Sequence, residues 1–232
     1  SQGKSTAARA TLKGCTVNEL ALFAGAGGGL LASQLLGWNT VCAVEIDSYC
    51  QQRLLDRQRD GCLPRFPIWD DVRTFDGKPW RGRVDVVSGG FPCQDISCAG
   101  KRAGVAGSRS GLVFEMLRIV DEIRPSFVFA ENSPNLRTNG LGEIIERLAK
   151  MGYMGRYGVL GAGDIGANHR RKRMWIVAIS ADANRIRRQQ KEGTFKEVRE
   201  RPAYGSEDDA GFGVADWWRL PRFKGVDDGL AD

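Results

Sequence analysis

The stretch NELALFAGAGGGLLASQLLGWNTVCAVEID (residues 18–47) alternates between two kinds of hydrophobic pattern. Residues 18–24 and 40–46 are short apolar runs typical of buried strands, and residues 28–37 between them have the spacing of a helix. A glycine-rich turn joins the first strand to this helix. A strand, a helix and a second strand in this order form the unit from which parallel α/β sheets are built.

The same alternation continues along most of the chain. Further helices are expected at residues 47–60, 111–123 and 141–153. Further strands are expected at residues 84–89, 126–132 and 173–180. We therefore predict an α/β protein with a doubly wound, mostly parallel sheet, in which Asp47 or Ser48 caps the second helix.

The chain is expected to divide into three parts. Residues 1–14 form a flexible lead-in, residues 15–180 the α/β domain, and residues 181–232 a small, irregular and basic C-terminal region. The chain has 232 residues, of which 42% are hydrophobic, so it can bury one core of its own. It contains no apolar run of about 18 residues, and we expect neither a membrane span nor a signal peptide.

Cysteine and histidine usage narrows the possible chemistry. The six cysteines lack the paired spacing of zinc sites, and a reduced protein of the cytoplasm is expected. His169 is the only histidine, which argues against a metal site of the usual kind and against a Ser–His–Asp triad. We therefore expect no bound metal.

The charge of the chain is unevenly distributed. The net charge is +6, and residues 168–201 hold eleven Lys and Arg against four acidic residues. Such a basic segment indicates a polyanionic partner, most simply nucleic acid. A solvated charged surface remains the alternative.

Ligands of doubly wound sheets bind at the carboxyl ends of the strands. The first predicted strand ends in the glycine turn, which suits an anionic group or is simply a tight turn. A nicotinamide fingerprint would need glycine where Leu30 stands. Glu45 follows Gly25 by the spacing of an acid that binds ribose hydroxyls, or it is a cap or a surface acid. Asp71, with Val72, follows a short apolar run and either binds an adenine amino group or lies in a turn.

A further predicted strand ends in VDVVSGGFPCQDISCAG (residues 84–100), which presents Cys93 directly after Pro92. Such a thiol is a nucleophile if its pKa is lowered, although a lone cysteine is more often buried filler. The next strand ends at Glu131, which adjacent strands would bring beside Cys93. A thiol and a carboxyl group without a histidine suit addition to an electron-poor ring, with the carboxyl group protonating a ring nitrogen.

Six motifs together resemble those of the cytosine-C5 DNA methyltransferases, in order and in spacing. They are FAGAGGG (23–29), EID (45–47), DDV (70–72), GGFPCQDIS (89–97), AENS (130–133) and RRKRMWIVA (170–178). The similarity covers residues 17–180, and RFPIWDDVRTFDGKPW (65–80) resembles the phage or prophage branch of the family. It implies a Rossmann-like catalytic domain that transfers a methyl group from S-adenosylmethionine to C5 of a flipped-out cytosine in double-stranded DNA, through a covalent adduct with Cys93.

The resemblance also implies roles for individual residues. The catalytic residues would be Cys93, Glu131, Arg171 and Arg173, with Glu131 protonating N3 and Arg173 contacting the O2 side of the base. The cofactor would contact Phe23, Gly25, Ala26, Gly27, Gly28, Glu45, Ile46, Asp71, Val72 and Pro92. The nucleic acid would contact Gln94, Ser97, Arg102, Arg109, Arg170 and Lys172.

The chain also departs from the family pattern. Asn168 and His169 replace the usual Pro–Gln pair, and Gly29 stands where the family often has a larger residue. No Gly–Asn motif follows the basic segment, so residues 181–232 are expected to be a reduced or truncated target-recognition region. Two alternatives stay open: an RNA (tRNA) cytosine-C5 methyltransferase, and a truncated DNA-binding remnant without catalysis. We expect a monomer.

Overall fold

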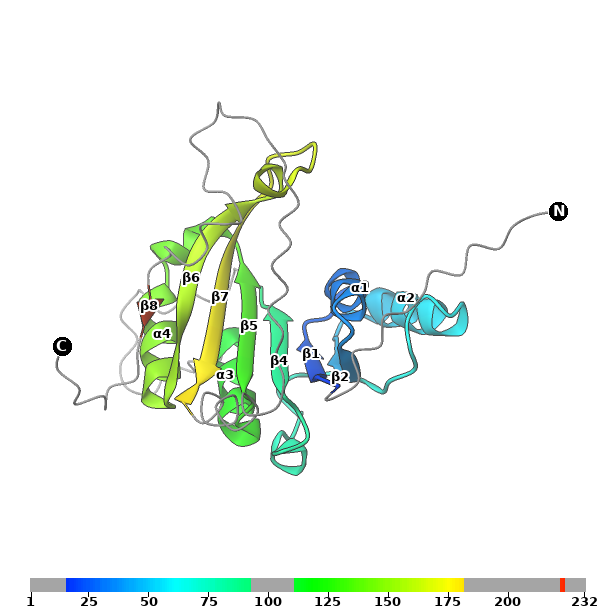
Figure 1. Ribbon diagram of the computed structural model, residues 1–232. Helices are drawn as coiled ribbons and strands as arrows, with labels where there is room; N and C mark the ends of the chain where they lie inside the picture. Colours follow the sequence, from blue (N-terminus) through cyan, green and yellow to red (C-terminus); the bar gives the residue numbers. More distant parts are fainter. Residues whose placement is uncertain (1–15, 93–110, 182–221, 224–232) are drawn as a thin grey trace, which may run out of the picture.

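The structure, a computed structural model, describes residues 16–92 and 111–181 and the backbone of residues 222–223 (Figure 1). The strands are β1 (Asn18–Leu22), β2 (Asn39–Val44), β3 (Ile68–Trp69), β4 (Val86–Gly90), β5 (Phe127–Asn132), β6 (Tyr153–Gly161), β7 (Lys172–Ser180) and β8 (Arg222–Phe223). The α-helices are α1 (Gly28–Leu35), α2 (Ser48–Arg59), α3 (Leu112–Ile123) and α4 (Leu141–Lys150). Short 3₁₀ helices are η1 (Lys78–Trp80), η4 (Pro134–Arg137) and η5 (Gly163–Ile165).

The strands form one sheet in the order β3-β2-β1-β4-β5-β7-β6-β8. Strands β3, β2, β1, β4 and β5 are parallel to one another, whereas β7 runs antiparallel to both β5 and β6. The strand order changes direction at β1 and β4, which is where doubly wound sheets bind their ligands. The predicted doubly wound, mostly parallel sheet is therefore confirmed.

Strand β6 is absent from the sequence-based expectations. Its sequence YMGRYGVLG carries glycines and an arginine, which interrupt the apolar pattern of a buried strand. The backbones of β6 and β7 approach closely at Gly155, where a Cβ atom would clash with the carbonyl oxygen of Val177. The predicted helix 141–153 accordingly ends earlier, at Lys150, and Tyr153 begins β6 with its hydroxyl donating to the Pro125 carbonyl at 2.7 Å.

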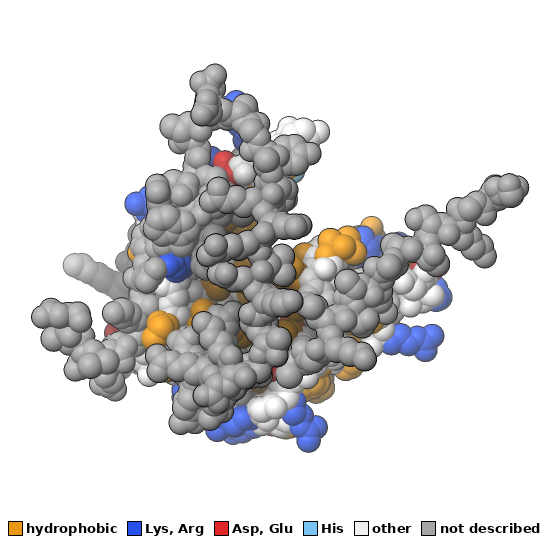
Figure 2. Space-filling model, viewed as in Figure 1, with side chains coloured by type: hydrophobic (Ala, Val, Ile, Leu, Met, Phe, Trp, Pro, Cys, Tyr) orange, Lys and Arg blue, Asp and Glu red, His pale blue; other side chains and the backbone are white. Residues whose placement is uncertain are grey.

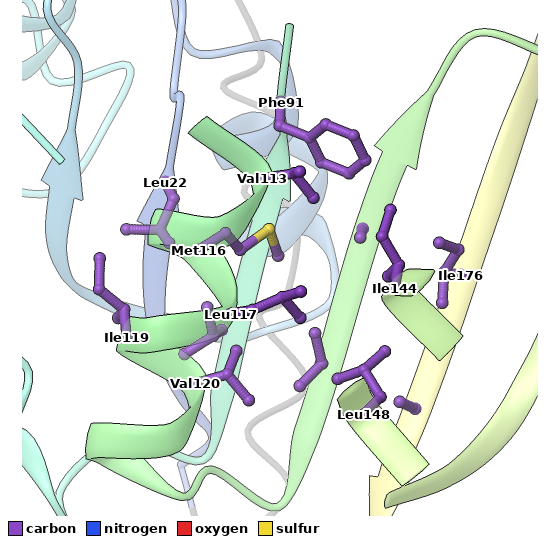
Figure 3. Close-up of a cluster of buried hydrophobic side chains, with 14 of the residues drawn as sticks. Leu22, Phe91, Val113, Met116, Leu117, Ile119, Val120, Ile144, Leu148 and Ile176 are labelled. Carbon is purple, nitrogen blue, oxygen red and sulfur yellow. The ribbon is translucent and has the colours of Figure 1, made fainter. Parts of the chain in front are cut away.

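Two hydrophobic layers cover opposite faces of the sheet. On one face α3 and α4 pack against the strands through residues such as Met116, Val120 and Leu148, which converge on the sheet in Figure 3. On the other face Leu30 of α1 and Leu54 of α2 pack over β1 and β2. Because successive strand residues alternate between the faces, neighbouring residues of β1 contribute to both layers.

A carboxyl group lies buried within the second layer. The Glu19 side chain, in β1, is 1% exposed. Its Oε1 accepts hydrogen bonds from the hydroxyls of Ser33 in α1 (2.8 Å) and Ser88 in β4 (2.6 Å). Its Oε2 accepts one from Thr40 in β2 (3.2 Å). One side chain therefore ties three neighbouring elements to the central strand.

We predict that Glu19→Leu lowers the free energy of unfolding by about 2 kcal/mol, because a buried hydroxyl without an acceptor, such as that of Thr40, costs about 1–3 kcal/mol, and the half-buried hydroxyl of Ser88 costs less. Ser33 keeps the Gly29 carbonyl as a second acceptor at 3.2 Å, so the loss falls mainly on Ser88 and Thr40. Urea unfolding measures the change. Glu19→Gln, which keeps one oxygen acceptor, is the control and should lose roughly half as much. A Leu variant as stable as the wild type would contradict the assigned role of the network.

Candidate active site

The turn between β1 and α1 is held in a conformation that requires glycine. Gly25 and Gly27 have φ angles of 54° and 92°, in the left-handed region. A Cβ atom at Gly27 would lie 2.9 Å from the Leu54 side chain, whereas Gly25 and Gly28 face open space. Phe23 also has a positive φ, 54°, which is uncommon for a residue with a side chain. The turn is thus closely packed against Leu54 at Gly27, whereas the space beside Gly25 and Gly28 is open.

Glu45 lies directly beside this turn. Its carboxylate is 9% exposed and accepts the Gly25 amide on Oε2 at 2.6 Å and the Asp47 amide on Oε1 at 2.8 Å. The expected proximity of Glu45 to Gly25 is therefore present. Glu45 is neither a surface acid nor the helix cap, since Asp47 caps α2 by accepting the Cys50 amide, and this bond lowers the pKa of Asp47. Ile46, between them, is exposed.

The segment after β3 carries the third candidate acid. Asp71 lies in a turn, in which the Thr74 amide donates to the Asp71 carbonyl at 3.1 Å. Arg73 binds its carboxylate, with Nη2 at 2.7 Å from Oδ2, and this hydrogen bonding lowers the pKa of Asp71. Val72 beside it is buried. Asp71 thus lies in a turn, as one of the two alternatives expected. A position in a turn is also compatible with the other alternative, in which the carboxylate binds an adenine amino group.

The ends of β4 and β5 bring two candidate catalytic residues together. Gly90 pairs with Glu131, and a Cβ atom at Gly90 would lie 2.8 Å from Glu131 Oε2, so the carboxyl group lies against a position that has no side chain. Arg173 of β7 forms an ion pair with Glu131, with Nε 2.6 Å from Oε1. The two side chains are 29% and 30% exposed, so the pair is accessible from solvent.

The segment leading to Cys93 is anchored at its start. Phe91 is buried, and its carbonyl accepts the side-chain amide of Asn132 at 2.9 Å, which joins the end of β4 to the end of β5. Pro92 is exposed. The candidate residues that follow lie outside the described residues: Cys93, Gln94, Ser97, Arg102 and Arg109.

The remaining basic candidates precede or begin β7. Arg170, Arg171 and Lys172 are exposed, and the Arg171 amide donates to His169 Nδ1 at 3.4 Å. The basic run therefore presents three cations to solvent next to the ion-paired Arg173.

A cavity of about 820 Å³ runs along one face of the sheet, from the starts of β1, β4 and β5 to their carboxyl ends. Phe23, Gly90, Glu131, Arg171 and Arg173 line one part of it, whereas Glu45 and Asp71 are not in its lining. The other part is apolar and extends over β5, β7 and α1, with a lining that includes Phe127, Phe129, Trp175, Val177, Ala32 and Leu36. Figure 2 shows hydrophobic side chains at the surface over α1, where Leu35 is 82% exposed.

Three residues of the site were missed by the sequence interpretation. Gly90, Asn132 and Arg73 each hold another candidate residue or its chain in place. Arg73 stands two residues after Asp71 and Asn132 directly follows Glu131, so proximity in sequence was an available indication. The need for glycine at position 90 depends on the register between β4 and β5, which the sequence does not specify.

The described residues contain no cluster that could bind a metal, and they include three free thiols. Within residues 16–92 and 111–181, no group of three His, Cys, Asp or Glu side chains could hold a metal ion. The helices in this part of the chain are too short or too polar to cross a membrane. Cys42, Cys50 and Cys62 are free thiols, and burial raises the pKa of Cys42 to about 11. Cys42 is therefore an unreactive core residue.

Comparison with known proteins gives consistent matches. The family model for C-5 cytosine-specific DNA methylase matches residues 17–208. Type II methyltransferase M.CviJI of Paramecium bursaria Chlorella virus IL3A is 34% identical over 165 residues, covering 70% of this chain and 43% of that protein. Type II methyltransferase M.Eco47II of Escherichia coli is 36% identical over 172 residues, covering 70% and 39%. This chain thus spans less than half the length of these relatives.

Solved structures agree on the fold. A prophage-encoded E. coli protein described as a DNA modification methyltransferase superposes with a TM-score of 0.58 at 24% identity, covering 73% of this chain and 48% of that one. S. pombe Dnmt2 methyltransferase gives a TM-score of 0.58 at 20% identity, covering 71% and 51%. The family model covers most of the chain, including all the described strands of the sheet except β8. The chain belongs to the C-5 cytosine-specific DNA methylase family.

Proposed function

We propose that this chain carries the catalytic domain of a DNA cytosine-C5 methyltransferase. The observation that carries the proposal is the Glu131–Arg173 ion pair, which lies against Gly90 in the wall of the cavity. A carboxyl group and a guanidinium side by side match the polar edge of cytosine, which presents a ring nitrogen, an amino group and a carbonyl oxygen. The family's description as a DNA methylase favours DNA over RNA as the substrate.

In this proposal Glu131 takes up a proton from solvent as the base separates it from Arg173, donates that proton to N3 and accepts a hydrogen bond from the amino group, while Arg173 donates to O2. Both contacts draw electrons from the ring, so C6 becomes electrophilic and the thiolate of Cys93 can add to it. The Sγ–C6 bond forms, and the displaced π electrons make C5 nucleophilic, so that C5 can accept a methyl group from a sulfonium donor whose sulfur would keep the electrons of the broken S–CH₃ bond. Water then takes the C5 proton, the C5–C6 double bond forms again as the Sγ–C6 bond breaks, Cys93 leaves as the thiolate, and N3 returns its proton to Glu131. The pairing of Gly90 with Glu131 supports these roles, because Cys93 follows Gly90 by three residues.

The strand ends also fit a nucleoside cofactor. S-Adenosylmethionine, when bound, supplies an electrophilic methyl group on a positively charged sulfur. We assign its contacts to Phe23, Gly25, Ala26, Gly27, Gly28, Glu45, Ile46, Asp71, Val72 and Pro92. The open space above Gly25 and Gly28 supports a backbone cradle. Glu45 is suited to ribose hydroxyls because each carboxylate oxygen can accept a second hydrogen bond.

The DNA would contact the exposed cations of the basic run. Arg170 and Lys172 face solvent beside the cavity, and Arg171 lines it, so this surface suits phosphates flanking a flipped base. Extruding a base costs about a few kcal/mol, and these contacts offset part of that cost. Gln94, Ser97, Arg102 and Arg109 are assigned to the opened duplex from the sequence alone.

A trapping experiment tests the reaction. The protein is mixed with S-adenosylmethionine and a duplex in which 5-fluorocytosine replaces cytosine, and denaturing electrophoresis detects a protein–DNA adduct. We expect a stable adduct whose peptide map identifies Cys93, because fluorine at C5 cannot leave as the proton does.

The matched control is Cys98→Ser, which should still form the adduct, whereas Cys93→Ser should form none. If Cys93→Ser formed as much adduct as the wild type, the nucleophile would be another residue. If the wild type bound DNA and cofactor but formed no adduct on DNA, the proposed reaction on DNA would be wrong. An adduct on fluorinated RNA in its place would point to the RNA alternative.

Two substitutions test the carboxyl group. Glu131→Gln should lower the rate of methyl transfer by about 10²–10⁴-fold, the usual contribution of a general acid. Gly90→Ala should lower it as well, since its Cβ atom would lie 2.8 Å from Glu131 Oε2 and displace the carboxyl group. Single-turnover transfer of a tritiated methyl group measures both rates.

Gly142→Ala is the control for the glycine substitution. Gly142 lies in α4, where an added Cβ atom would meet no other described atom within 4 Å, so this position should tolerate alanine without loss of rate. A Gly90→Ala enzyme as fast as the Gly142→Ala enzyme would show that the close approach at Gly90 does not matter to the chemistry.

A further inference from the structure

The segment that follows β3 depends on α3 for its position. Strand β3 has only two residues and pairs only with β2 among the described strands. The next residues leave the sheet edge, and Val72 and Phe75 insert into the hydrophobic layer that contains α3. The Phe75 ring stacks on Trp80 with centroids 5.9 Å apart. The segment that carries Asp71 is therefore held mainly by contacts outside the sheet.

Arg118 of α3 binds the backbone of this segment at two points. Its Nη2 donates to the Val72 carbonyl and its Nη1 to the Phe75 carbonyl, each at 3.0 Å. Two acids of the same helix hold the guanidinium, with Nε 2.8 Å from Glu115 and Nη1 2.8 Å from Glu122. The two acids of α3 thus fix the planar guanidinium, whose Nη groups donate to the two carbonyls of the segment.

Glu122 completes the attachment. Besides binding Arg118, its Oε2 accepts the Gly77 amide at 2.8 Å. A Cβ atom at Gly77 would lie 2.9 Å from this oxygen and 3.1 Å from Ile123 Cγ1, so any larger residue here would have to displace the Glu122 carboxylate and shift the chain from α3. Three backbone groups between residues 72 and 77 are thus bound by two side chains one helical turn apart.

We propose that Arg118 is a positioning residue for the adenine end of the cofactor, acting through the Val72 carbonyl. This inference rests on the proposed function, in which Asp71 and Val72 contact the adenine. Among the described residues, the polar partners of Arg118 are Glu115, Glu122, Val72 and Phe75, which include neither a residue of the cavity lining nor Glu131, Arg171 or Arg173. From α3 it fixes the peptide between Val72 and the residue that follows, whereas Arg73 of the segment itself orients the Asp71 carboxylate, so α3 sets the position of the segment that carries both adenine contacts.

Calorimetric binding of S-adenosylhomocysteine to the 232-residue protein tests the inference without any methyl transfer. Arg118→Lys keeps a positive charge for Glu122 but lacks the planar fork that reaches two carbonyls. We expect it to weaken binding about tenfold. Gly77→Ala, which separates the segment from α3, should weaken binding by a similar factor.

Arg124→Lys is the matched control. Arg124 ends the same helix, pairs with Asp121 and donates to the Met151 carbonyl at 3.0 Å, so it also attaches α3 to a neighbouring segment. It has no contact with residues 70–77 among the described interactions. Its substitution should change binding less than twofold.

A double-substitution cycle with Asp71→Asn separates positioning from general stability. If Arg118 acts through the segment, Asp71→Asn and Arg118→Lys together weaken binding by clearly less than the product of their separate factors. For Asp71→Asn combined with Arg124→Lys, the factors by which the two substitutions weaken binding should multiply. Multiplicative effects for Arg118, or unchanged binding by Arg118→Lys, would overturn the inference while leaving the proposed function intact. A wild-type protein that bound no S-adenosylhomocysteine would overturn the cofactor assignment, and the inference with it.

Discussion

The buried carboxylate of Glu19 is the constraint on which the arrangement of the site depends. Its partners are Ser33, just after the glycine turn, Thr40, before Glu45, and Ser88, two residues before Gly90. A buried polar group must find its hydrogen bonds, and here it finds them on three different elements. Apolar packing alone tolerates small shifts between a helix and a sheet, whereas this network allows only one relative placement. Helix α1 and strands β1, β2 and β4, whose carboxyl ends carry the site, therefore keep fixed positions relative to one another.

Close backbone approach then brings distant residues into contact. Glu45 reaches Gly25 across 20 residues, and Asn132 reaches Phe91 across 41. Glycine stands at three of the closest approaches: Gly27 under the first turn, Gly77 against α3 and Gly90 under Glu131. At each of these positions a side chain would occupy the space of a contact that holds the site together.

The sequence predicted those features that depend on local patterns. Periodicity gave the fold class, and spacing gave the proximity of Glu45 to Gly25. It missed β6, because glycine and arginine interrupt the strand pattern where β6 and β7 pack backbone to backbone. The ion pair between Glu131 and Arg173 also escaped prediction, since it depends on the antiparallel register of β7 against β5. Long-range register is set by packing, which a local pattern does not contain.

Each acid of the site already has a partner. Glu45 holds two amides and keeps free lone pairs, so a ribose can bind without displacing them. Glu131 instead shares Arg173, and a cytosine edge would separate the two groups onto neighbouring atoms of the base. Partly exposed ion pairs are worth about 0–1 kcal/mol, which is less than the few kcal/mol that extruding a base costs. Breaking the Glu131–Arg173 ion pair therefore adds little to the free-energy cost of extruding the base. Until the base binds, the ion pair keeps both side chains in position.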